Sequence, residues 1–161
     1  MKHKVFKKTV SLIMSLMLLF FICGCSNTKT YNSAELSKQI LKETSFSELK
    51  ELSGSSLSSY FAFKDGDVKR FSVRVSATGE SADTVACFEV LDDTQRSAVI
   101  SGISKYLTKL STSFKATMEN EYNNVQNRVL VEVEDIVILV ICNDYATVRQ
   151  YLTDLGAKEI F

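Results

Sequence analysis

The sequence predicts an α+β domain in which a mainly antiparallel, four-stranded sheet has helices packed on one of its faces. Two observations lead to this fold class. Two pairs of short strand patterns lie on either side of one long helical stripe of apolar residues, and the members of each pair are joined by a turn or a short loop. Hairpin-linked strands separated by a helix favour an antiparallel sheet with its helices gathered on one side.

The segment before the first strand pair has helical patterns. Asn32 is placed to cap a helix that ends near Lys42, because Glu35 stands at the position that completes a capping box. The same pattern at residues 45–48 predicts a short second helix that continues to about residue 52. Residues 57–63 form an apolar cluster, for which we expect another short helix or an extended segment.

Four segments have strand patterns. Residues 70–76 and 129–133 alternate apolar and polar side chains, which is typical of a strand with one buried face. We expect residues 84–91 to form the strand that pairs with the first of these. Residues 136–142 are a continuous apolar run, which predicts a central strand buried on both faces.

Two further helices are expected after the second strand. Residues 92–118 have apolar side chains at intervals of three and four, which predicts the longest helix of the chain. Residues 119–127 are polar and are expected to form a connection. The last helix is capped by Asn143 or Asp144 and ends near Gly156, since glycine is favoured just past a helix end.

The first 25 residues have the pattern of a targeting segment. Four lysines within the first eight residues precede the mostly apolar residues 10–22. This run is shorter than the roughly 20 residues of a membrane span, but it has the size of the apolar region of a signal peptide. The run ends in Ile22-Cys23-Gly24-Cys25, which looks like a lipobox, with an aliphatic residue three positions before a cysteine.

We therefore expect residues 1–24 to be a signal peptide that is removed, and Cys25 to become attached to lipid. Two acyl chains on this cysteine would hold the protein stably at the extracytoplasmic face of the cell membrane. Residues 25–32 would then be the lipidated cysteine and a polar tether, and residues 33–161 a single domain. An ordinary secretory signal, or a membrane anchor that is never cut, is the alternative.

Composition narrows the classes of function. Removal of residues 1–24 takes away four of the 19 basic residues and none of the 19 acidic ones, so the net charge falls from 0 to −4. A mildly acidic chain lacks the basic footprint of nucleic-acid binding. The single histidine, His3, leaves with the same segment, which excludes the usual histidine-dependent triads and zinc sites. We expect no catalytic residue, no metal, no cofactor and no enzymatic activity.

Cys87 and Cys142 remain besides the expected anchor, and both fall in predicted strands. An extracytoplasmic compartment permits a disulfide between them. The alternative is two buried thiols that act as small apolar side chains.

Charged side chains on the expected outer face of the sheet form a candidate partner surface. Arg70 and Arg74 share one face of their strand, and we expect Glu89 and Glu132 on the same face. These residues either dock a partner or form cross-strand charge pairs on a solvated sheet.

Two weaker patterns also occur. Ser47-Glu48-Leu49-Lys50 matches the Ser-x-x-Lys arrangement of some nucleophilic serines, but its companion motifs are missing. Acidic residues at 119–121 and 132–135 offer oxygen ligands for calcium, yet no loop has the spacing of an EF-hand. Chance matches in a serine-rich chain are the better account of the first pattern, and solvated turns are the better account of the second.

Residues 60–142 resemble a family of small lipoproteins from Gram-positive, clostridial-type bacteria that carry a domain of unknown function. The similar stretches are residues 81–88, the long helix, Tyr122-Asn123-Asn124-Val125 and residues 128–141. Thr84 departs from this family, which often has an acidic residue there. The resemblance implies a lipobox followed by one α+β domain and brings no known activity.

Three functions remain open for such a chain. The first is a non-enzymatic interaction or accessory module of the cell envelope, with an unknown envelope protein as its partner. The second is a lipoprotein that binds a small ligand in a pocket between sheet and helices. The third is an enzyme that uses a pair of carboxylates, which would need two acidic side chains within about 5–10 Å of each other in a cleft.

Overall fold

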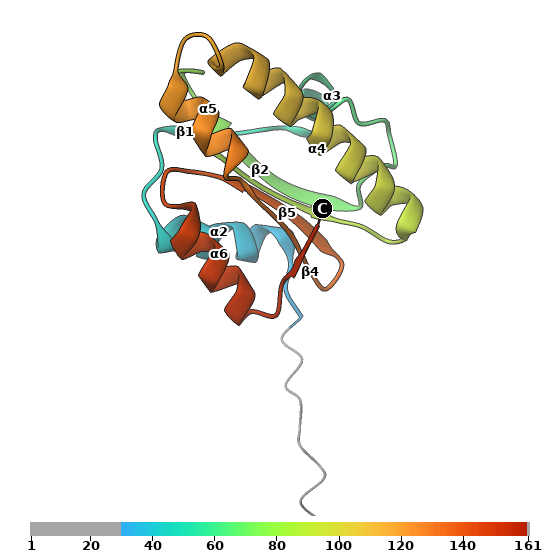
Figure 1. Cartoon of the computed structure of the whole chain (residues 1–161). Helices are drawn as coiled ribbons and strands as arrows, with labels where there is room; N and C mark the ends of the chain where they lie inside the picture. Colours follow the sequence, from blue (N-terminus) through green and yellow to red (C-terminus); the bar gives the residue numbers. More distant parts are fainter. Residues whose placement is uncertain (1–29, 161) are drawn as a thin grey trace, which may run out of the picture. The chain divides into compact units, whose positions relative to one another are not determined.

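The fold is an open, six-stranded antiparallel sheet with helices on both faces (Figure 1). The computed structural model describes residues 30–160. The helices of this part are α2 (Ser33–Glu43), α3 (Gly54–Phe61), α4 (Asp93–Phe114), α5 (Glu119–Gln126) and α6 (Tyr145–Asp154). The strands are β1 (Leu49–Glu51), β2 (Arg70–Ser76), β3 (Thr84–Glu89), β4 (Val129–Val133), β5 (Ile136–Ile141) and β6 (Lys158–Glu159). Their order in the sheet is β1-β2-β3-β5-β4-β6, and every neighbouring pair is antiparallel.

This architecture confirms the α+β class and the antiparallel sheet, and it corrects the number of strands from four to six. The two additional strands, β1 and β6, lie at the edges of the sheet and have only three and two residues. Segments this short leave no repeating pattern in the sequence. The four longer strands lie where the sequence predicts them.

The expectation that helices pack on one face only is wrong. Figure 1 shows α4 and α5 on one side of the sheet and α2 and α6 on the other. Two separate sets of buried apolar side chains correspond to these two layers. The reason lies in β3 and β5, in which every residue is buried, because a strand without an exposed face needs cover on both sides.

The layer formed by α3, α4 and α5 has an aromatic centre. The ring of Phe61 lies 4.6 Å from that of Tyr106 and packs edge-on against Phe88 on β3, 5.2 Å away. Gly102 on α4 lets the helix approach this cluster closely, since a Cβ atom there would lie 2.6 Å from the carbonyl oxygen of Phe61. The close approach fixes α4 against the sheet.

The second layer is formed by α2 and α6. Leu36 and Ile40 of α2 and Val148 and Leu152 of α6 are fully buried against the opposite face of the sheet. Both helices begin at the caps expected from the sequence: the side chain of Asn32 accepts a hydrogen bond from the backbone N–H of Glu35 at 2.9 Å, and Asp144 caps α6. Gly156 follows the end of α6 with a φ of +82°, a conformation that favours glycine.

Two local predictions are wrong. The helix expected from the capping-box pattern at residues 45–48 is replaced by β1, because Leu49 and its neighbours pair with the end of β2. Residues 119–127 were expected to form a connection, but they contain α5, whose only buried residue is Val125. Pairing and packing with distant residues determine the secondary structure of both segments, and these contacts cannot be predicted from the local sequence.

Candidate functional site

The first candidate site residues lie on the sheet face covered by α2. The guanidinium group of Arg74 donates to Glu51 at 2.8 Å and to the hydroxyl of Ser37 on α2 at 3.0 Å, and only 21% of its side chain is exposed. Arg70 is more open, at 64%, and forms an ion pair with Glu89 at 2.7 Å. Both arginines therefore have partners within the chain, and a role in docking another protein stays a prediction.

Glu89 fixes the start of α2 to the sheet. One of its carboxylate oxygens accepts hydrogen bonds from the backbone N–H and the hydroxyl of Ser33, at 2.8 and 2.9 Å, and the other accepts from Arg70. Burial alone would raise the pKa of Glu89, but these hydrogen bonds outweigh burial and lower it. The charged carboxylate thus stabilises the N-terminus of the helix, where the helix dipole is positive.

Glu132 does not share a face with Glu89, which corrects the expectation from the sequence. Its carboxylate points to the α4 side, where both oxygens accept from the Nε of Arg96, at 3.0 and 2.9 Å. This ion pair holds the first part of α4 against β4. The four charged residues of the predicted surface therefore divide between the two layers.

Cys87 and Cys142 are free, buried thiols, so the disulfide that the sequence left open is not formed. In the pairing of β3 with β5, Cys87 lies opposite Ile138, four residues before Cys142. Four residues of a strand span about 13 Å, whereas a disulfide needs Cα atoms within about 7 Å. Burial raises the pKa of both thiols to about 12, so both are protonated at neutral pH.

The weaker motifs do not come together as sites. Lys50 lies on β1 near the ring of Tyr60, and Ser47 precedes the strand with its backbone N–H bound to Asp83. Glu121 accepts from the backbone N–H of Ala82 at 2.8 Å, so it ties α5 to the loop before β3. Between residues 30 and 160 no group of three or more His, Cys, Asp or Glu side chains is arranged to hold a metal ion.

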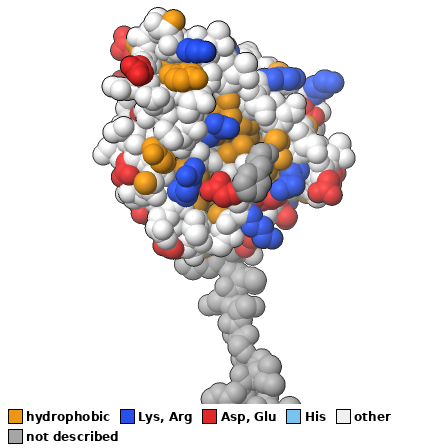
Figure 2. All heavy atoms as spheres, viewed as in Figure 1, with side chains coloured by type: hydrophobic (Ala, Val, Ile, Leu, Met, Phe, Trp, Pro, Cys, Tyr) orange, Lys and Arg blue, Asp and Glu red, His pale blue; other side chains and the backbone are white. Residues whose placement is uncertain are grey.

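A groove between α4 and α5 is the strongest candidate site. Its volume is about 450 Å³, within the range of pockets that hold a small ligand. Helix α4 contributes four hydroxyl side chains, from Ser104, Thr108, Ser111 and Thr112. Figure 2 shows hydrophobic side chains near the centre of the face drawn there, with both basic and acidic side chains around them.

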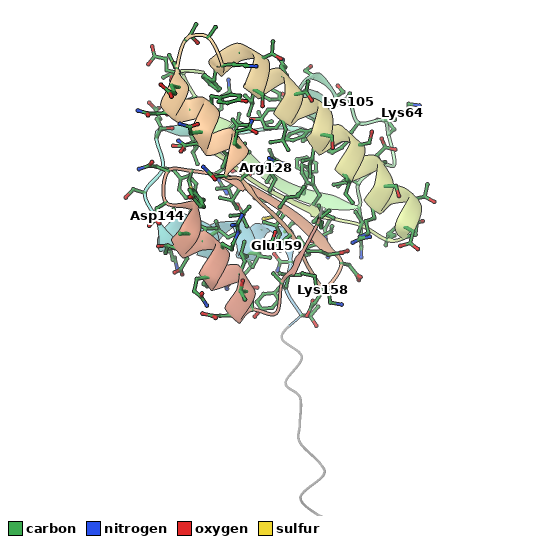
Figure 3. All side chains as sticks on the ribbon, in the orientation of Figure 1. Lys64, Lys105, Arg128, Asp144, Lys158 and Glu159 are labelled. Carbon is green, nitrogen blue, oxygen red and sulfur yellow. The ribbon has the colours of Figure 1, made fainter. Side chains whose placement is uncertain are left out.

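The other wall of the groove comes from α5 and the residues that follow it, and the floor combines Leu107 of α4 with Val125 of α5. Tyr122, Val125 and Gln126 line this side, and the amide of Gln126 donates to the hydroxyl of Ser111 across the groove at 3.3 Å. Lys115, just after α4, and Arg128, just before β4, also line it. In Figure 3, Arg128 lies where the end of α5 leads into the sheet.

This groove was not predicted from the sequence. Its hydroxyl residues lie on the side of α4 away from the apolar stripe, and those at positions 104, 108 and 112 are four residues apart. This spacing places them on one face of a helix, which is the signal that would have revealed them. The remaining lining residues belong to α5, which the sequence did not predict as a helix.

A smaller hollow of about 190 Å³ lies beside β2 and α4, lined in part by Lys50, Lys109 and Tyr106. The hydroxyl of Tyr106 shares a hydrogen bond with that of Thr84 at 2.9 Å. Burial raises the pKa of Tyr106 to about 12, so the phenol is neutral. This arrangement anchors α4 to β3, and we assign the hollow no ligand.

The predicted signal peptide (residues 1–24) and Cys25 lie outside the described residues. No helix among residues 30–160 combines the length and the apolar character needed to cross a membrane.

Comparison with known proteins gives one match. The model of the family described as "Domain of unknown function (DUF4358)" matches residues 42–142. These residues include β1 to β5 and helices α3 to α5, and therefore the whole groove. No curated protein and no solved structure matches the chain.

Proposed function

The chain belongs to the DUF4358 family, a domain of unknown function, and from that premise we propose a membrane-anchored, extracytoplasmic accessory module that acts by binding and not by catalysis. The anchor would be a lipid on Cys25, exposed as the first residue when residues 1–24 are removed. The lysine-rich start, the apolar run and the Ile22-Cys23-Gly24-Cys25 sequence support this part of the proposal.

The groove between α4 and α5 is the observation that supports binding. Three of its four hydroxyls on α4 donate to backbone carbonyls of the helix, as Thr108 does to Ser104 at 2.9 Å. Hydroxyls used in this way are oriented for recognition and have no base beside them to make them nucleophilic. The two thiols of the domain are neutral and buried, which fits a domain that binds without covalent chemistry.

Mass spectrometry of the processed protein tests the anchor. Membranes from cells that express the wild type should yield an N-terminal peptide that starts at Cys25 and carries a diacylglyceryl group. Cys25→Ala should abolish this peptide and leave an uncut chain. Cys23→Ala is the matched control, because alanine is as acceptable as cysteine among the small residues that precede the modified cysteine.

Two results would contradict the anchor. One is an acylated peptide in the Cys25→Ala variant, and the other is wild-type protein that is uncut or cut elsewhere. Loss of processing in both variants would instead indicate that residues 22–25 tolerate no substitution, whichever cysteine is changed.

A lipoprotein that binds a small ligand is the more specific candidate, and the volume of the groove favours it. A pocket of about 450 Å³ accepts one small molecule, whereas a protein partner normally needs about 800 Å² of surface on each side. The chemistry of the lining then decides which class of molecule fits.

A further inference from the structure

We propose that the groove between α4 and α5 binds an acidic saccharide, meaning a sugar or polyol that carries a phosphate or a carboxylate. This inference rests on the ligand-binding form of the function proposed above. Three properties of the lining lead to it: cations without carboxylate partners, a row of hydroxyl acceptors, and an apolar floor with one aromatic ring.

The cations are Lys115 and Arg128, and neither forms an ion pair among residues 30–160. Each of the other four arginines of the chain is paired with a glutamate. The guanidinium group of Arg128 reaches the carbonyls of Val125 and Gln126 only at 3.5 and 3.3 Å, through one of its nitrogens. Its remaining N–H groups suit an oxyanion, which a guanidinium binds with two parallel hydrogen bonds.

The charged residues that line the groove have one sign, whereas the acidic residues of α5, Glu119 and Glu121, lie outside the lining. From residue 94 to residue 118, the chain contains four basic residues and no acidic one, and no carboxylate lines the groove. A cavity walled by protein concentrates the field of such cations and attracts an anion. The net charge of −4 expected for the processed chain makes this basic groove a local feature and not a property of the whole surface.

The hydroxyls are arranged as acceptors. Ser104, Thr108 and Thr112 each donate their hydroxyl hydrogen to the carbonyl four residues earlier, all at 2.9 Å. Their oxygen lone pairs remain for hydrogens donated by a ligand, and sugar hydroxyls are such donors. Ser111 differs, because its oxygen accepts from Gln126 and its own hydrogen is left to donate to an oxyanion.

The apolar floor of the groove would contact the ring of a bound sugar. Leu107 and Val125 are buried, and Tyr122 is partly buried beside them. A sugar has apolar C–H faces as well as hydroxyl edges, so it can lie on an apolar and aromatic floor while its edges meet the hydroxyl wall. A bare inorganic anion would leave the floor and most of the hydroxyls without contacts.

Isothermal titration calorimetry on the full chain, purified with its anchor, tests the inference. A non-ionic detergent without a sugar headgroup avoids competition for the groove. The probes are glucose 6-phosphate and glucuronate as acidic sugars, glucose as the neutral sugar and inorganic phosphate as the bare anion. We expect saturable binding of at least one acidic sugar, and at least tenfold weaker binding of glucose and of phosphate.

Variants then locate the site. Lys115→Gln and Arg128→Gln should each weaken binding of the acidic sugar about tenfold, since each removes one charge from the lining. Lys105→Gln is the matched control, because Lys105 is an exposed residue of the same helix and does not line the groove. Lys115 follows the last residue of α4 and its side chain makes no described ion pair, so its replacement leaves the fold intact.

The possible outcomes distinguish a failure of the ligand assignment from a failure of the proposed lipid anchor. No binding of either acidic sugar, equal binding of glucose or phosphate, or equal effects of all three substitutions would overturn the inference. If Cys25 is processed normally in such a protein, the anchored module stands and only the ligand assignment fails. If acidic sugars bind as expected but Cys25 is not acylated, the anchor fails and the groove assignment stands.

Discussion

Glu89→Gln should destabilise the domain by about 2 kcal/mol at neutral pH. The carboxylate accepts three hydrogen bonds, two from Ser33 and one from Arg70, and hydrogen bonds to a charged group contribute about 1.5–3 kcal/mol each. Glutamine keeps one oxygen for Ser33 but turns an NH₂ group toward the guanidinium of Arg70. The loss of about one charged hydrogen bond gives the estimate, which corresponds to a fall in Tm of about 4–8 °C.

The measurement is thermal unfolding of the full chain followed by circular dichroism. Glu51→Gln is the control, because it removes the same charge from an ion pair whose glutamate is 64% exposed. Exposed ion pairs contribute at most about 1 kcal/mol, so this variant should unfold within a few degrees of the wild type. Equal effects of the two substitutions would show that Glu89 does not fix α2 through its buried hydrogen bonds.

The pH dependence of stability provides a second test of the role of Glu89. The hydrogen bonds lower the pKa of Glu89 in the folded state below the value of about 4.3 found in unfolded chains. Its contribution is therefore fully present above pH 4.3 and is lost as the pH falls through the folded-state pKa. The difference in stability between wild type and Glu89→Gln should shrink below pH 4.3, and a difference that stays constant from pH 7 to pH 3 would refute the argument.

Two other predictions follow from buried groups. Gly102→Ala should destabilise the domain by about 2 kcal/mol, because the new Cβ would lie 2.3 Å from the ring of Phe63 and 2.6 Å from the backbone oxygen of Phe61, and overpacking costs about 1–3 kcal/mol. Ser101→Ala on the exposed side of the same helix should be neutral or stabilising in the same urea titration, and equal stability of both variants would contradict the close approach of α4. Cys87 and Cys142 should not react with a thiol reagent in the folded protein, because burial raises the pKa of both to about 12 and only the thiolate is reactive. In denaturant, the thiols of Cys87 and Cys142 should both react, and in the Cys87→Ala variant only that of Cys142 should react. Fast labelling of these thiols in the native protein would show that the strands open.

The sequence was informative where one segment carries its own pattern. The alternation in residues 70–76 and 129–133 identifies β2 and β4, and Asn32 and Asp144 mark the start of α2 and α6. It was uninformative where a partner decides the structure. Residues 49–51 are a strand because the end of β2 offers unpaired backbone groups, which outweighs their local helical pattern.

The second layer of helices could have been predicted from the sequence. The continuous apolar run at residues 136–142 indicates a strand buried on both faces, and such a strand in the middle of a sheet needs cover on each side. Helices on one face alone would leave the other face of this strand exposed to solvent. The groove was harder to foresee, because it needs α5, and the sequence of α5 has only Tyr122 and Val125 as large apolar residues.

The positions of α2 and of the groove make the two parts of the proposed function independent. Helix α2, the first element after the predicted tether, packs on one face of the sheet and is fixed there by Glu89, whereas the groove lies between helices on the other face (Figure 1). The family match includes the whole groove. It includes only the last two residues of α2, and the rest of this helix lies outside the match. The residues tested for the ligand therefore lie on the opposite side of the sheet from α2. We therefore expect Lys115→Gln to change sugar binding without changing the processing of Cys25, and Cys25→Ala to leave the affinity of the groove unaltered.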